Sequence, residues 1–149
     1  MNNLIILLLT FAFLFLILNH LNKFKENYEV STGNIEIMTL NNTNYREVIS
    51  TTSNFQLVLM SLLPDEDIGA EMHPNTTQFI RVEGGQGVCD INGKKYEMHD
   101  GDFVVIPPGA KHNIMNTSKS NRLQMYVIYT PPEHSFDTKE EKKPEREDH

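Results

Sequence analysis

Two short stretches of the sequence carry side chains that commonly bind metals. In the first, Glu71 and His73 lie two residues apart, and Gln78 follows after four intervening residues. Residues two apart in a strand point to the same face, so the Glu71 carboxylate and the His73 imidazole can share one site. Gln78 opens the next strand and can return to that face after a short turn. The second stretch delivers another imidazole, His112, after a Pro/Gly turn.

Each of these residues also has a purely structural interpretation. His73 and His112 could belong to a metal-free polar interior in which their nitrogens are hydrogen-bonded. Glu71 could pair with Arg81 or with a nearby lysine, and the Gln78 amide could bond a ligand or the backbone. The other histidines are expected to be surface residues rather than ligands: His20, His99, His134 and His149.

Short runs rich in β-branched and aromatic residues, separated by turn signals, predict the strands that position these side chains. Asn92-Gly93 predicts a type I′ hairpin turn, because both positions of that turn need positive φ. No helical periodicity of useful length follows the N-terminal segment. Strands at this spacing predict an all-β sandwich, jelly roll or small barrel. The expected strands are residues 55–63, 79–83, 87–91, 95–98, 103–106, 112–115 and 123–129.

Other polar and reactive side chains are assigned structural positions. Asn113 and Asn116 are expected to bond turn backbone after the Pro/Gly bend. Alternation along the strand from Gln78 places Arg81 on the outer face. The single cysteine, Cys89, is expected to be a buried small hydrophobe rather than a nucleophile, because no motif activates it.

The second stretch resembles the second motif of the cupins. That motif is a glycine, five residues, P-x-G, two residues, a histidine, three residues and an asparagine. Its fixed positions are matched here by Gly101, Pro107, Gly109, His112 and Asn116.

The first stretch resembles the first cupin motif in spacing but not in every residue type. The family pattern is H-x-H, three or four residues, a glutamate, six residues and a glycine. Here Glu71 replaces the first histidine, Gln78 replaces the glutamate, and Asp65 stands at the leading glycine. The resemblance spans residues 45–132 and is strongest to small single-domain cupins that end in Y-x-P-P-E-H, here residues 129–134.

The resemblance implies a small cupin β-barrel, or double-stranded β-helix, with a metal in its mouth. The implied ligands are Glu71, His73, Gln78 and His112. They suit one divalent transition metal, Fe, Mn, Ni or Zn, with positions left for water or substrate. Cupin chemistry implies a dioxygenase or a sugar or sugar-phosphate isomerase acting on a small polar substrate. The alternative is a non-catalytic cupin that binds a small ligand or serves as an assembly module at a membrane. Cupins also commonly form homodimers.

The 149 residues divide by composition into four segments. Residues 1–25 are expected to form a single-pass membrane anchor: the run 4–18 contains one polar residue, and membrane contact would extend over residues 4–21. Lys23 and Lys25 follow the run and favour a cytosolic domain. Residues 26–44 are expected to be a linker with an edge strand near 34–40, residues 45–132 the cupin domain, and residues 133–149 a charged flexible tail. The net charge of −7 argues against a nucleic-acid partner.

Overall fold

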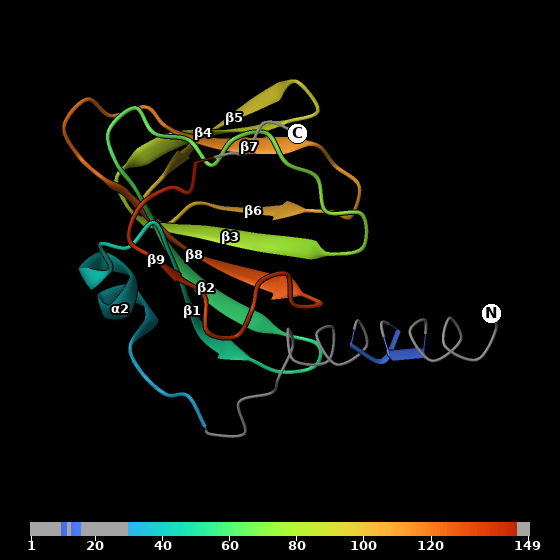
Figure 1. Ribbon diagram of the computed structural model, residues 1–149. Helices are drawn as coiled ribbons and strands as arrows, with labels where there is room; N and C mark the ends of the chain where they lie inside the picture. The colour runs from blue at the N-terminus through green and yellow to red at the C-terminus, as the bar shows by residue number, and fades with distance from the viewer. Residues whose placement is uncertain (1–9, 12, 16–29, 146–149) are drawn as a thin grey trace.

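The computed structural model describes residues 10–11, 13–15 and 30–145 of the chain (Figure 1). One short helix and nine strands follow residue 30. Their bounds are α2 Ile35–Asn41, β1 Arg46–Thr51, β2 Gln56–Leu62, β3 Thr77–Gly84, β4 Gln86–Ile91, β5 Lys94–His99, β6 Phe103–Ile106, β7 His112–Asn116, β8 Leu123–Thr130 and β9 Lys139–Glu140.

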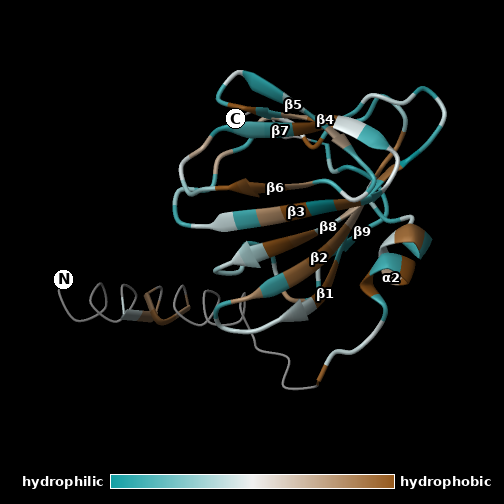
Figure 2. Cartoon of the chain, turned by 180° about the vertical axis from the view of Figure 1, so that it is seen from behind, coloured by the Kyte–Doolittle hydropathy of each residue, from teal (hydrophilic) through white to brown (hydrophobic). Residues whose placement is uncertain are grey.

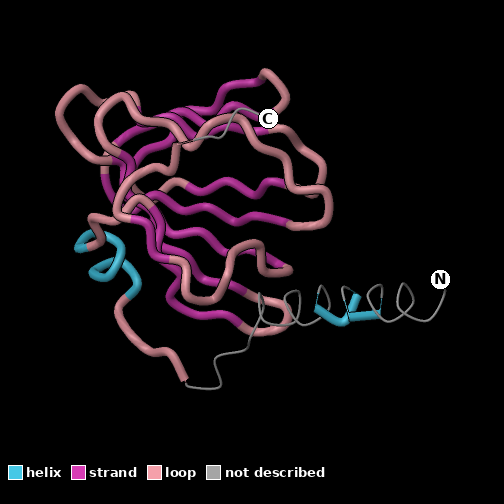
Figure 3. Tube along the Cα trace, viewed as in Figure 1, coloured by secondary structure: helices cyan, strands magenta, loops and turns pink. Residues whose placement is uncertain are grey.

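The strands form two antiparallel sheets that face each other (Figures 1 and 3). The larger sheet has the order β6-β3-β8-β2-β1-β9, and the smaller has the order β5-β4-β7. Several neighbours in the larger sheet are far apart in sequence, since β8 pairs with both β2 and β3 and β9 pairs with β1. This arrangement confirms the predicted all-β jelly roll. All seven predicted strands are present with ends shifted by at most two residues.

The core lies between the sheets because the strands alternate buried and partly exposed residues. Along β8, Leu123, Met125, Val127 and Tyr129 are buried and the residues between them are not. In the larger sheet β2, β6 and β8 are mostly hydrophobic, whereas the edge strand β5 of the smaller sheet is mostly hydrophilic (Figure 2). Cys89 is fully buried, as predicted, and burial raises the pKa of its thiol to about 12.

Two turns that shape the barrel need unusual backbone conformations. Asn92 and Gly93 both have positive φ, 52° and 85°, which confirms the predicted type I′ turn. Gly85, the glycine that ends the first motif, has φ +88°. A Cβ at Gly85 would lie 2.2 Å from the carbonyl oxygen of Arg122, so a side chain is excluded by both space and conformation.

The edge strand predicted near residues 34–40 is wrong, because that segment forms α2. Asn34 caps the helix, its side chain accepting a hydrogen bond from Ile37 N at 3.0 Å. At the other end, the Gln124 side chain of β8 donates to Leu40 O at 2.7 Å. A seven-residue helix is marginal by itself, and contacts with the sheet stabilise it here.

The flexible tail predicted for residues 133–149 is also wrong over its first part. β9 pairs with β1, and Val48 N donates to Thr138 O at 2.9 Å. An ion pair of 3.0 Å joins Arg46 to Glu140. Polar contacts therefore fix a segment whose low apolar content predicts mobility. Residues 146–149 lie outside the described residues.

The predicted membrane segment falls largely outside the described part of the chain. Of residues 4–18, the structure describes only 10–11 and 13–15. No helix within the described residues is both long and apolar enough to cross a bilayer.

Candidate metal centre

Two backbone contacts bring the two predicted motifs together. Glu71 lies in the loop before β3, and His112 is the first residue of β7. They form an isolated antiparallel bridge in which the N–H of each donates to the carbonyl of the other at 2.9 Å. In the Pro/Gly bend that precedes β7, Gly109 N donates to His73 O at 2.8 Å. The Pro/Gly bend of the second motif is thus bonded directly to the loop that carries the first.

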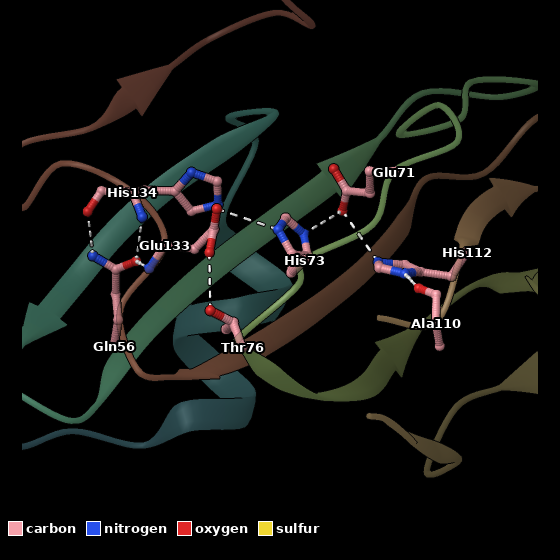
Figure 4. A network of polar contacts seen from close by, with 8 residues as sticks. All are labelled: Gln56, Glu71, His73, Thr76, Ala110, His112, Glu133 and His134. Carbon is pink, nitrogen blue, oxygen red and sulfur yellow. Dashed lines mark hydrogen bonds and ion pairs between the residues drawn. The ribbon is translucent and has the colours of Figure 1, made fainter. Parts of the chain in front are cut away.

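The side chains of Glu71, His73 and His112 converge on one point (Figure 4). One ligand atom from each lies within 4.8 Å of the others. Oε1 of Glu71 is 3.3 Å from Nε2 of His73 and 3.3 Å from Nε2 of His112. The His112 side chain is 1% exposed, whereas the Glu71 side chain is 23% exposed. The cluster is therefore buried on the His112 side and open to solvent on the Glu71 side.

The outer ring nitrogens are engaged in a way that leaves both Nε2 atoms available as ligands. Nδ1 of His112 lies 2.9 Å from the Ala110 carbonyl, which can only accept a hydrogen bond. Nδ1 of His73 lies 3.2 Å from Oε1 of Glu133. Each Nδ1 is thus suited to hold the ring proton, which places the lone pair on Nε2. Both Nε2 atoms are buried and have no aligned hydrogen-bond partner among the described residues.

The charges in the cluster support each other. Burial alone would raise the pKa of Glu71, but the imidazoles of His112 and His73 outweigh it and hold that pKa well below its usual range. Hydrogen-bonding contact with Glu71 raises the pKa of His73, against the opposing effect of burial. A cation, proton or metal, is therefore favoured between these groups. Since metal and proton compete for the same lone pairs, metal binding should weaken as the pH falls.

Gln78 points into the barrel interior, as its place on the strand predicts. It is 1% exposed and lies on the same face of β3 as the buried Ile80 and Val82. Neither its amide nitrogen nor its amide oxygen has a hydrogen-bond partner among the described residues. The alternative that this amide bonds the backbone is wrong. A buried amide without a partner is costly, so the environment of Gln78 suits an amide that binds a metal ion.

The sequence also allowed Glu71 to pair with Arg81, and that alternative is wrong. Arg81 lies on the outer side of β3, as predicted, and its guanidinium contacts Glu83 at 2.9 Å rather than Glu71. His99 is exposed, as expected. His134 is not a simple surface residue, because its ring packs edge-on against the buried Tyr129 with centroids 5.0 Å apart.

Asn116 has the structural role predicted for it. Its amide donates to the carbonyls of Leu62, Leu63 and Asn121, and its oxygen accepts from Ser118 N at 2.9 Å. Asn113 does not bond turn backbone with its amide nitrogen, which instead donates to the Asp67 carboxylate at 2.8 Å.

Glu133 is the site residue that the sequence prediction missed. Its carboxylate accepts from Thr76 Oγ1 at 3.0 Å through one oxygen and contacts His73 Nδ1 through the other. A carboxylate behind a ligating imidazole fixes the orientation of the ring and increases its basicity. The available signal is the P-P-E-H ending shared with small cupins, which includes Glu133 but lies partly in the segment predicted to be a flexible tail.

Comparison with known proteins identifies the family. A sequence profile described as "Cupin domain" matches residues 58–129, which run from β2 to the end of the barrel. The chain belongs to the cupins. This cupin is also similar to a Bacillus halodurans protein of known crystal structure, with 35% identity and a TM-score of 0.75. The match covers 80% of this chain and 96% of that one.

Curated relatives of this cupin include two uncharacterized proteins. One, from Acanthamoeba polyphaga mimivirus, is 43% identical over 71% of this chain and 68% of its own length. YrkC of Bacillus subtilis is 40% identical over 74% of this chain and 62% of its own length. A gentisate 1,2-dioxygenase of Aquipseudomonas alcaligenes is 28% identical over 68% of this chain, which spans 29% of that enzyme. A quercetin 2,3-dioxygenase of Bacillus subtilis is 29% identical over 53% of this chain and 23% of its own length.

Replacing Glu133 with alanine is expected to weaken metal binding by about tenfold, because the His73 ring loses the carboxylate that orients it. Competition with a chromophoric chelator measures the affinity. Glu133→Gln keeps an acceptor for Nδ1 and should restore part of the loss. Equal affinity in all three proteins would show that Glu133 does not support the metal.

Proposed function

We propose that this cupin is a metal-dependent oxygenase that binds one Fe(II) ion through Glu71, His73, Gln78 and His112 and acts on a small polar substrate. One observation carries the proposal: two buried Nε2 atoms without aligned hydrogen bonds converge on one carboxylate. Two histidines and a carboxylate with open positions are the ligand set of non-haem Fe(II) oxygenases. The similarity to two proteins named as dioxygenases supports the same reaction class.

The charge of the ligand set indicates which substrates would bind. Glu71 contributes one negative charge, while His73, His112 and Gln78 contribute none when they act as neutral ligands. A divalent ion in the site would therefore retain about one positive charge. The excess favours substrates that present an anionic oxygen, such as a phenolate or a carboxylate. The partly exposed Glu71 side of the cluster is the side from which such a substrate reaches the ligands.

The chain and the ion would have separate tasks. Bound Fe(II) would supply a redox-active Lewis acid with positions open to O2 and to the substrate. The Ala110 carbonyl and Glu133 hold the protons of His112 and His73 on Nδ1, so both rings present Nε2. Tyr129 closes the floor of the site next to His73, with ring centroids 6.0 Å apart, and excludes water from that side.

Nitric oxide binding to the Fe(II)-loaded chain tests this function. NO occupies positions open to O2, and its complex with high-spin Fe(II) gives a characteristic electron paramagnetic resonance signal. We expect stoichiometric Fe(II) and this signal in the wild type, and neither in His112→Ala. Oxygen consumption is then measured with gentisate and with quercetin as probes. Failure to take up Fe(II), or an iron centre closed to NO, would favour the non-catalytic ligand-binding alternative.

Gln78→Glu is expected to tighten metal binding on the order of tenfold, because a second anion would face the ion. Gln78→Leu removes the amide oxygen at similar size and is expected to weaken binding. Titration with Mn²⁺ against a competing chelator measures both effects. If both variants bind Mn²⁺ as the wild type does, Gln78 is not a ligand.

Membrane anchoring through residues 4–18 is a further part of the proposal and rests on the apolar composition of that run. The domain would face the cytosol, on the side favoured by Lys23 and Lys25. Fractionation of cells that produce the full chain tests it, with a chain lacking residues 1–25 as the control. The full chain should resist extraction by high salt and by alkaline carbonate. Recovery of the full chain in the supernatant would contradict the anchor.

A further inference from the structure

A buried glutamine, Gln56, holds the segment that carries Glu133 through hydrogen bonds to its backbone. Gln56, the first residue of β2, is completely buried. Its Oε1 accepts from the backbone N–H of Glu133 at 3.2 Å and of His134 at 2.9 Å. Its Nε2 donates to His134 O at 2.8 Å and to Thr51 Oγ1 at 3.0 Å. Both ends of the amide are thus used to hold two consecutive residues.

These hydrogen bonds from Gln56 determine where the Glu133 carboxylate lies. The Glu133 side chain is 30% exposed, so close packing does not fix it. Its position depends on its backbone, held by Gln56, and on the hydrogen bond from Thr76 Oγ1 at 3.0 Å. Figure 4 shows the resulting series of contacts from Gln56 through Glu133 to His73 and on to Glu71.

We infer that Gln56 is a positioning residue for the metal centre, acting through the backbone of Glu133 and His134 to keep the Glu133 carboxylate on Nδ1 of His73. This inference rests on the metal site of the proposed function. The hydrogen bonds of the Gln56 amide go to Thr51, Glu133 and His134, and none of these is a proposed ligand, so its effect passes through Glu133. Because coupling between two events is reciprocal, a metal on His73 also holds residues 133–134 more firmly against Gln56.

The first test is a double-mutant cycle in which Co²⁺ affinity of the purified full chain is measured by its visible absorption. The variants are Gln56→Leu, Glu133→Ala and the two combined. Each single change is expected to weaken Co²⁺ binding about tenfold, the range found when the outer partner of a ligating histidine is lost. The double variant should lose little more than either single variant, since both changes remove the same contact. Independent, multiplying losses, or a Gln56→Leu chain with wild-type affinity, would overturn the inference.

Two controls separate positioning from general destabilisation. Leu62→Ala creates a cavity at the other end of β2 and should lower stability without changing Co²⁺ affinity. Gln56→Glu keeps an acceptor for the two N–H groups, and burial favours its protonated form, which can still donate to His134 O, so this variant should recover part of the affinity. If Leu62→Ala weakens Co²⁺ binding as much as Gln56→Leu, the effect is one of stability and the inference fails.

Hydrogen exchange on the wild type supplies a test that needs no variant. Adding Co²⁺ is expected to slow exchange of the Glu133 and His134 amides, which donate to Gln56. Unchanged exchange at these amides in the Co²⁺-bound chain would overturn the inference while leaving the metal site intact. A wild-type chain that binds no Co²⁺ or Fe(II) would instead overturn the proposed function, and this inference with it.

Discussion

Replacing His112 with alanine is expected to abolish metal retention, with affinity falling by more than about 100-fold. The His112 Nε2 lies 3.3 Å from the Glu71 carboxylate on a side chain that is 1% exposed. The alanine variant would keep only one of the two imidazoles in the cluster. The measurement is the ratio of metal to protein after loading, gel filtration and elemental analysis.

His99→Ala is the matched control for this experiment. The His99 side chain is 60% exposed and lies next to Asp102 outside the cluster, so its loss should leave the metal ratio unchanged. Thermal unfolding of both apo-proteins checks that the barrel is intact. If His112→Ala retained metal at the wild-type ratio, the proposed metal site would be ruled out, and the proposed oxygenase function with it.

Replacing Asn116 with alanine is expected to lower the free energy of unfolding by about 3 kcal/mol. The residue is 3% exposed, and its amide nitrogen donates to three backbone carbonyls, two where β2 ends and one in the loop before β8. Alanine leaves those carbonyls and the N–H of Ser118 without their partner at a place that water reaches poorly. Denaturation by urea, followed by circular dichroism of the full chain, measures the change.

Asn54→Ala provides the comparison for that experiment. Asn54 is exposed, and its amide donates only to the neighbouring Ser53 hydroxyl, so the variant should stay within about 0.5 kcal/mol of the wild type. An Asn116→Ala protein as stable as Asn54→Ala would show that the loop carbonyls find other partners. It would contradict the structural role assigned to this motif residue.

The strands could be predicted from the sequence because their signal is local. The residues of β6, for example, occur between Asp100-Gly101 and a Pro-Pro-Gly turn, and the observed bounds equal the predicted ones. The segment of α2 has the opposite property. It contains Ile35, Ile37 and Thr39, which favour strands, and its helical state depends on the distant Gln124 side chain. Within residues 34–40, the local helix signals are the Asn34 cap and Glu36 in the first turn, and they are weak beside the strand-favouring residues.

The candidate site divides in the same way. The resemblance of the two motifs to those of cupins predicted that Glu71, His73 and His112 meet, although Glu71 and His73 lie in a loop and not in the strand expected from their spacing. Gln78 was correctly placed inside, and its ligation stays a prediction. Glu133 was missed because its position depends on Gln56, 77 residues earlier in the chain. The low apolar content of its segment predicted mobility, but amino-acid composition does not reveal which backbone N–H groups find hydrogen-bond partners elsewhere in the fold.

The two-residue strand β9 also protects the molecule from unwanted association. Without it, β1 would present free backbone groups along the margin of the larger sheet, which is a template for pairing with other chains. β9 covers Arg46 and Glu47, and its own Lys139 and Glu140 form ion pairs of 2.9 Å and 3.0 Å with these residues. A strand so short and so charged offers little for a further strand to extend. The same segment that supports His73 therefore acts as a guard against aggregation, and a proteolytic cut near residue 135 would threaten solubility together with metal binding.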